Sequence, residues 1–243
     1  MKRFKTIAAS LLLTCSLALS GCTSVQANDL TEGITKGQAE GKAADSAFVN
    51  ANMDFSLELF KNVQGKKKGE NVLVSPLSVA SALAMTANGA DGETLAEMEK
   101  LLGGDIDIDQ LNSYLYSYLQ SMTSGEGFKL HIANSVWFRD DPRLTVEKDF
   151  LQKTVDYYDA EVYREAFDDK TANAINSWVK ANTDGMIPKI IDKIDSDTVM
   201  YLINALAFDS EWAEKYEKDQ IGDGTFTDSN GNAQNVEMMN SLE

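Results

Sequence analysis

The chain has 243 residues, of which 43% are hydrophobic and 25% are charged, a balance typical of a globular protein with a sizeable core. Its formal net charge of −16 repels the phosphates of nucleic acids, so nucleic acid binding is excluded as a function. The two cysteines, Cys15 and Cys22, both lie near the N-terminus. The rest of the chain therefore has no disulfide, no cysteine nucleophile and no zinc-thiolate site.

Residues 1–21 have the pattern of a signal peptide, with basic residues first, then an apolar stretch, then small residues. The apolar stretch is too short and too interrupted by Ser and Thr to predict a membrane-spanning helix. It ends in Leu19-Ser20-Gly21-Cys22, which resembles the lipobox of bacterial lipoproteins. This resemblance implies cleavage before Cys22 and acylation of its sulfur. We therefore expect an extracellular, cell-surface lipoprotein anchored in the membrane through Cys22, with an ordinary signal peptide as the alternative.

Residues 22–45 are polar, contain Gly33, Gly37 and Gly41, and carry few large apolar side chains. This composition predicts a flexible tether. A regular hydrophobic pattern begins at about Ala47, so we expect the globular domain to occupy residues 46–243.

The first half of the domain shows the periodicity of helices, in segments near residues 48–60, 76–87, 95–102 and 111–122. The second of these has the clearest beginning, because Ser75 is a good N-cap and Pro76 suits the first helical position. This helix is apolar nearly all round, which predicts that it is buried. The apolar residues 72–74 before it predict a short buried strand.

Residues 130–138 then alternate as in a strand whose two faces are both largely apolar. A helix near 150–158, a strand near 160–167 and a helix from about 171 follow. Residues 199–208 are apolar apart from Asn204, which predicts a central strand covered on both faces. Helices and strands are interleaved without a βαβ repeat, so the predicted class is α+β, with helices packed on a sheet.

The sequence contains no motif for catalysis or for a cofactor. Its single histidine, His131, lies in a predicted strand, and no G-x-S-x-G pattern accompanies it. Two acidic runs, at 105–109 and 228–232, have the spacing of calcium ligands but lack the glycine and glutamate of an EF-hand loop. Helix caps and turns explain them better. We therefore expect no enzyme, no metal and no cofactor.

Five segments, in the order and spacing of the family, resemble serpins. They are residues 71–80, 132–138, 175–179 leading to 183–187, 202–208 through Trp212, and Phe226 with 236–239. Met186 departs from the family pattern, in which lysine is usual. The resemblance covers about residues 48–243.

The resemblance implies a metastable fold around a five-stranded sheet and inhibition of serine proteases, with cysteine proteases as the alternative targets. In serpins a protease cleaves an exposed reactive loop, which then inserts into the sheet as an extra strand. The family pattern assigns Ser75, Ser78 and Asn204 to the shutter beneath the sheet and Trp212 to the breach at its top. From the residues themselves, Asn204 facing the two serines would form a small polar latch. We expect a monomer.

The family's reactive loop and closing strands lie toward the C-terminus, whereas this sequence stops at Glu243, a little past the middle of such a domain. We therefore expect an incomplete fold with no scissile bond, as in a fragment of a longer product, and poor folding of residues 46–243 alone. A non-inhibitory surface lipoprotein with a serpin fold, binding a ligand or partner, is the alternative function.

Overall fold

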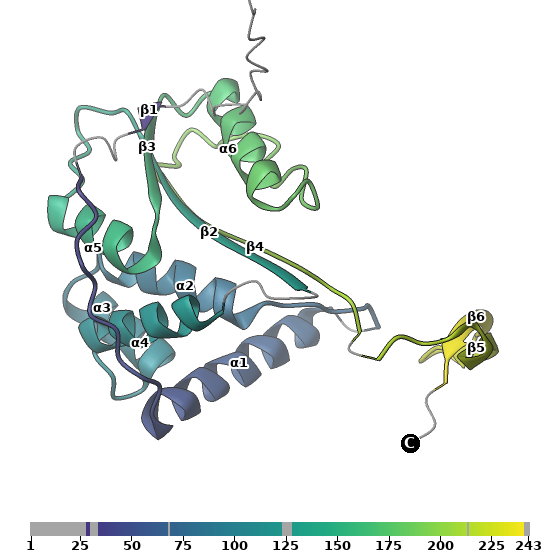
Figure 1. The fold of residues 1–243 in the computed structure, drawn as a ribbon. Helices are drawn as coiled ribbons and strands as arrows, with labels where there is room; N and C mark the ends of the chain where they lie inside the picture. Colours follow the sequence, from purple (N-terminus) through teal and green to yellow (C-terminus); the bar gives the residue numbers. More distant parts are fainter. Residues whose placement is uncertain (1–27, 30–33, 68, 123–127, 213, 241–243) are drawn as a thin grey trace, which may run out of the picture.

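The computed structural model describes residues 28–29, 34–67, 69–122, 128–212 and 214–240, arranged as in Figure 1. The helices are α1 (Ser46–Lys66), α2 (Pro76–Ala87), α3 (Gly92–Gly103), α4 (Ile108–Ser121), α5 (Lys148–Tyr158) and α6 (Asp169–Asn182), with a 3₁₀ turn η2 (Lys218–Gln220). The strands are β1 (Asn28–Asp29), β2 (Phe128–Arg139), β3 (Glu161–Glu165), β4 (Met200–Ser210), β5 (Ile221–Thr227) and β6 (Ala233–Met239). The predicted α+β class is confirmed.

The helices begin where local chemistry favours a helix start. The Ser75 side chain accepts the backbone N–H of Ser78 and Pro76 is the first residue of α2, as predicted. Asp107 caps α4 and Asp168 caps α6 in the same manner. The first acidic run is thus explained by helix capping.

A mixed sheet in the order β1-β3-β2-β4 forms the centre of the body. Strands β2 and β3 are parallel, whereas β4 runs antiparallel to β2. Side chains of β2 alternate between two cores: Val136 and Phe138 pack with helices α1 to α5, and Trp137 packs with α6. Figure 1 shows these helices on opposite sides of the strands. Both faces of the sheet are therefore covered.

Strands β5 and β6 form a separate antiparallel hairpin that stands away from the body in Figure 1. Its turn contains Gly231 at φ +85°, a conformation that glycine adopts without strain. The Asp228 carboxylate accepts the backbone N–H groups of Asn230 and Asn232. The second acidic run is therefore a turn, as predicted.

Two expectations differ from the structure. Residues 72–74 are extended but belong to no sheet in the described chain, and Leu73 is 99% exposed. A strand needs a neighbour that exchanges hydrogen bonds with it, and hydrophobicity alone does not provide one.

The second difference concerns residues 34–45, which we call the N-terminal strap. The backbone N–H of Lys42 donates to the carbonyl of Ser113 in α4 at 3.0 Å, and the N–H of Gly37 donates to Asp156 in α5 at 2.6 Å. At Gly41 the strap lies so close to α4 that an added Cβ would meet the Ser117 hydroxyl at 2.2 Å. Residues 34–45 thus lie against α4 and α5 in this structure, whereas composition predicted a flexible tether.

Candidate functional site

The candidate site lies along β4, the strand that carries Asn204. Eleven residue pairs join β4 to β2, from Phe128 opposite Ser210 to Phe138 opposite Met200. On its other side β4 pairs with no strand of the described chain. Helices pack on both faces of its middle part, as predicted, and among the described residues it is the edge strand of the sheet, so its expected place in the middle of a larger sheet stays a prediction. The pattern of apolar residues along a strand indicates which faces of the strand are buried, but it does not indicate whether one or both edges pair with other strands.

The predicted shutter residues Ser75 and Ser78 lie at the beginning of α2. Their hydroxyl groups are 3.0 Å apart and hydrogen-bonded, and the Ser75 hydroxyl also accepts the N–H of Ser78 at 3.4 Å. Ser78 and Asn204 line the same cavity, of about 480 Å³, between α2, β4 and residues 190–191. Ser75 lines a neighbouring apolar cavity instead. The structure thus brings Ser78 and Asn204 to one cavity at the unpaired edge.

The side-chain amide of Asn204 makes a different hydrogen bond from the one expected. It donates to the side-chain oxygen of Asn134 at 2.8 Å, because Asn134 lies directly opposite on β2. The Asn134 amide in turn donates to the carbonyl of Tyr158 at 2.7 Å. The side-chain oxygen of Asn204, Oδ1, is buried and has no hydrogen-bond partner among the described residues. The expected latch between Asn204 and the serines is therefore replaced by an asparagine pair across two strands.

This pair continues into a buried polar network between the helices. The Tyr158 hydroxyl donates to Asn112 at 2.6 Å, and Asn112 exchanges two hydrogen bonds with Asn88, at 2.8 and 3.0 Å. Burial raises the pKa of Tyr158 far above its ordinary value, so the phenol stays a donor. The network links β4 and β2 to α5, α4 and the end of α2. Sequence reasoning missed Asn112 and Asn134, although an amide inside an apolar run was the available signal.

Trp212, predicted as the breach residue, follows β4 on the way to the hairpin. It is 68% exposed, and its ring meets that of Tyr216 edge-on at 6.4 Å. The lipidation residue Cys22 lies outside the described residues. His131 lies on β2, half-exposed, with its Nε2 atom 3.3 Å from the Asp184 carboxylate just after α6. This is the strand position that the sequence predicted.

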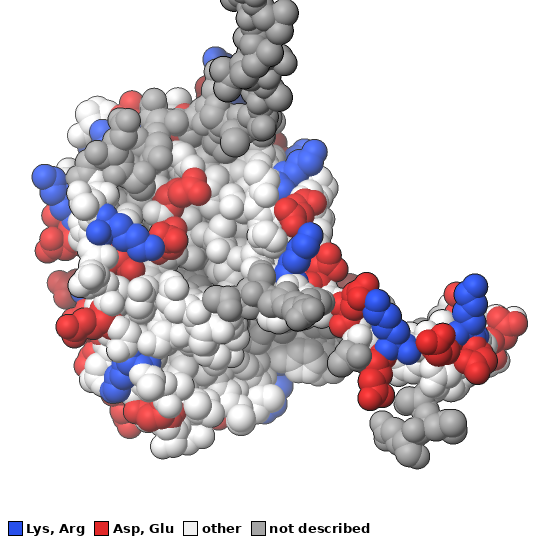
Figure 2. All heavy atoms as spheres, in the orientation of Figure 1, with Lys and Arg blue, Asp and Glu red and all other residues white. Residues whose placement is uncertain are grey.

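The described residues contain no cluster of three or more His, Cys, Asp or Glu that could hold a metal ion. Within the same ranges, no helix combines the length and the hydropathy needed to cross a bilayer. On the face shown in Figure 2, basic side chains are interspersed with acidic ones and do not gather into one patch. Such a mixture is typical of a solvated protein surface.

Comparison with known proteins identifies the family. The profile described as Serpin (serine protease inhibitor) matches residues 50–243. Leukocyte elastase inhibitor of Equus caballus is 32% identical over 199 residues, which cover 78% of this chain and 51% of that protein. An uncharacterized serpin-like protein of Methanosarcina mazei is 30% identical over 254 residues, covering 98% of this chain and 58% of the relative.

The same family appears among solved structures. The native state of tengpin, a thermophilic serpin, matches with a TM-score of 0.84 and 52% identity, over 89% of this chain and 55% of that one. The chain therefore belongs to the serpin family, as the five sequence segments indicated. It spans about half the length of the curated relatives that it matches.

Proposed function

We propose that the full-length protein inhibits serine endopeptidases by accepting a cleaved loop of its own chain as a new strand beside β4. Family membership and a relative named as an elastase inhibitor support this class of activity. The proposal concerns the whole protein, because in the serpin pattern the reactive loop is C-terminal to the segments that this chain matches.

The family match carries the proposal, and the edge of β4 that has no strand partner among the described residues is where the new strand would pair. Alternate residues of β4 between Met200 and Phe208 direct their backbone N–H and C=O groups to this side, and no strand of the described chain pairs with β4 there. A long strand with an open edge is a ready template for another extended segment. Because side chains in the middle of β4 are buried against helices on both faces, an added strand there would pack between the same two layers.

Two polar side chains, Asn204 and Ser78, lie beside this edge, where they could form hydrogen bonds with an incoming strand. The side-chain oxygen of Asn204 is buried and has no hydrogen-bond partner among the described residues. Ser78 lines the same cavity as Asn204. A buried acceptor without a partner costs about 1–3 kcal/mol, so a donor on an incoming strand would recover that free energy. Asn204 thus acts as a positioning residue for the new strand.

In the proposed reaction the serine oxygen of the protease attacks the carbonyl carbon of the scissile bond. The amine of the bond leaves with a proton, and an ester joins the protease to the loop. Insertion of the loop beside β4 would hold the protease at this ester. The lipobox sequence leads us to propose that this takes place on the cell surface, with Cys22 in the membrane.

The experiment is to incubate the full-length protein with elastase, trypsin and subtilisin and to separate the products on a denaturing gel. A band at the sum of the two masses less the C-terminal peptide that leaves as the amine is expected, sensitive to base and absent when the protease serine is replaced by alanine. Complete cleavage of the protein with full protease activity retained would reject inhibition and favour the non-inhibitory binding protein. Labelling with radioactive palmitate, lost in Cys22→Ser, tests the anchor separately.

A further inference from the structure

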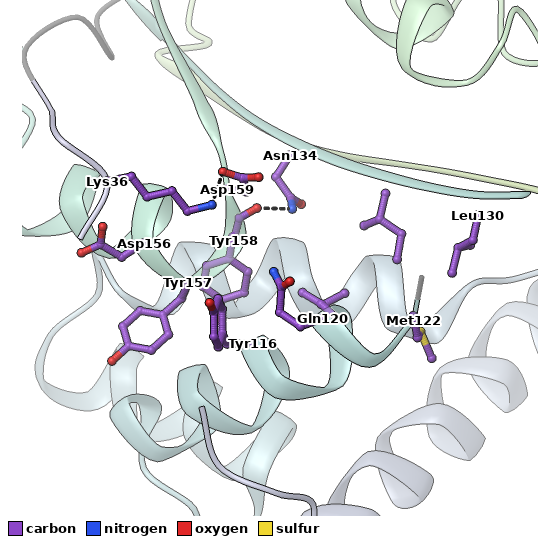
Figure 3. Close-up of a pocket in the computed structure, with 12 residues that line it drawn as sticks. Lys36, Tyr116, Gln120, Met122, Leu130, Asn134, Asp156, Tyr157, Tyr158 and Asp159 are labelled. Carbon is purple, nitrogen blue, oxygen red and sulfur yellow. Dashed lines mark hydrogen bonds and ion pairs between the residues drawn. The ribbon is translucent and has the colours of Figure 1, made fainter. Parts of the chain in front are cut away.

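A second cavity, of about 220 Å³, lies between α4, α5, the beginning of β2 and the N-terminal strap (Figure 3). Its floor is apolar and is made by four half-buried side chains, Leu119, Met122, Leu130 and Ile132. We call this cavity the α4–α5 pocket. Asn134, the partner of Asn204, also lines this pocket, but the pocket lies on the helix side of β2 and no step of the proposed inhibition places a ligand in it.

The mouth of the α4–α5 pocket is negative. Asp156 and Asp159 line it, at the C-terminal end of α5. The end of α4 also lines the pocket, through Met122, the C-cap residue. The last carbonyl groups of a helix lack intrahelical donors and carry the negative end of the helix dipole. Two carboxylates and the C-terminal end of α5 at this side of the pocket favour a cation, whereas Met122 and the end of α4 lie at the other side (Figure 3). The acidic balance of the whole chain acts in the same direction.

An ammonium group already occupies this mouth. The Nζ atom of Lys36, on the strap, lies 2.6 Å from the Asp159 carboxylate, as the dashed line in Figure 3 shows. Both side chains are substantially exposed, at 47% and 75%. An exposed ion pair contributes little because water and salt screen it, so a competing cation can displace Lys36.

Two aromatic rings stand at the same opening. Tyr116 and Tyr157 line the α4–α5 pocket and meet edge-on, with ring centroids 6.2 Å apart. Tyrosine rings attract cations through their faces and supply apolar area to a flat ligand. The apolar side chains, the two tyrosine rings and the two carboxylates together suit a ligand that has an apolar or aromatic part and a positive charge.

We propose that the α4–α5 pocket binds a small hydrophobic primary amine, whose ammonium group takes the place of Lys36 beside Asp159. The apolar part of the amine lies on the floor made by Leu119, Met122, Leu130 and Ile132. Carboxylic acids with the same apolar part are excluded by Asp156 and Asp159. Because Lys36 belongs to the strap, the amine also releases the strap at this corner.

The test measures binding to the full-length protein by isothermal titration calorimetry, with tryptamine as the probe. Indole-3-propionate has the same ring with the opposite charge, and indole-3-ethanol has the same ring without charge. Tryptamine is expected to bind at least about tenfold more tightly than indole-3-propionate, with affinity falling as salt rises. Equal affinity for the two compounds, or no heat from tryptamine at millimolar concentration, would overturn the proposal.

Two surface substitutions distinguish binding in the α4–α5 pocket from nonspecific binding of tryptamine elsewhere on the protein. Lys36→Ala removes the internal competitor and should tighten tryptamine binding by about two- to fivefold, the factor that matches an exposed ion pair. Asp159→Asn should weaken it by a similar factor. A purely structural role for Lys36 predicts the reverse, weaker binding in Lys36→Ala. Lys189→Ala, at a lysine paired with Asp192 elsewhere on the surface, is the matched control and should leave the affinity unchanged.

Discussion

Replacing Asn112 by alanine tests the buried network that joins the helices beneath the sheet. Asn112 is fully buried and makes three hydrogen bonds, one with the Tyr158 hydroxyl and two with the Asn88 side chain. Asn112→Ala removes all three. Tyr158→Phe removes one of them and leaves Asn112 with both of its bonds to Asn88.

The structure gives the expected magnitudes. A hydrogen bond contributes about 1 kcal/mol net, so Tyr158→Phe should lower the free energy of unfolding by about 1 kcal/mol. Asn112→Ala loses about 3 kcal/mol in bonds and leaves the buried phenol without its Asn112 acceptor, which costs about 1–3 kcal/mol more. Adding Tyr158→Phe to Asn112→Ala removes that orphan hydroxyl. The double variant should therefore be no less stable than Asn112→Ala alone.

Urea unfolding of the full-length protein, followed by circular dichroism, measures the three variants against the parent. The expected double-mutant cycle shows a coupling of about 2–4 kcal/mol between the two positions, since both single variants lose the Tyr158–Asn112 bond and only Asn112→Ala leaves the hydroxyl unpaired. Additive effects, within about 0.5 kcal/mol, would show that Tyr158 and Asn112 do not act together and would refute the network.

Further predictions concern the strand edge, the caps and the strap. Asn134→Ala should cost about 1 kcal/mol more than Asn204→Ala in urea unfolding, because the first substitution breaks two hydrogen bonds and the second breaks one. Asn204→Ala removes the unpartnered Asn204 side-chain oxygen but leaves the buried Asn134 oxygen without its donor, so these two effects offset each other. Equal costs would contradict the pairing. Hydrogen bonds hold the pKa of Asp45 below its ordinary 3.8, chiefly that from the Tyr114 hydroxyl, and the N–H of Thr171 does the same for Asp168. Their contribution to stability is therefore complete above about pH 4 and is lost as the pH falls below it, so Asp168→Asn should flatten the acid limb of a stability–pH curve. Gly41→Val should displace the strap from α4 and speed cleavage of residues 34–45 by thermolysin, while Gly65→Val, at an open position, should not.

The placement of the strap shows how a polar, glycine-containing sequence can be ordered. Its contacts are backbone and side-chain hydrogen bonds and one exposed ion pair, and Gly41 permits its close approach to α4. None of these leaves a hydrophobic period, so composition predicted a tether. Ile34, packed against the main core, was the one apolar signal.

The chain itself determined those features whose causes are local. Helix starts follow from capping residues such as Ser75 and Asp107, and the alternation in residues 130–138 fixes which side chains face which core. The family was readable for the same reason, since its five segments are stretches of consecutive residues.

Only the tertiary structure decided which residues far apart in the chain form hydrogen bonds, strand pairs and ion pairs with each other. Asn204 bonds to Asn134, rather than to the serines, because the antiparallel register of β2 and β4 sets these two residues opposite each other. The position of β4 at the edge of the described sheet and the ion pair between Lys36 and Asp159 likewise depend on residues far apart in the sequence. Hydrogen bonds and ion pairs between residues far apart in the chain depend on how elements are arranged in space, and periodicity carries no record of that arrangement.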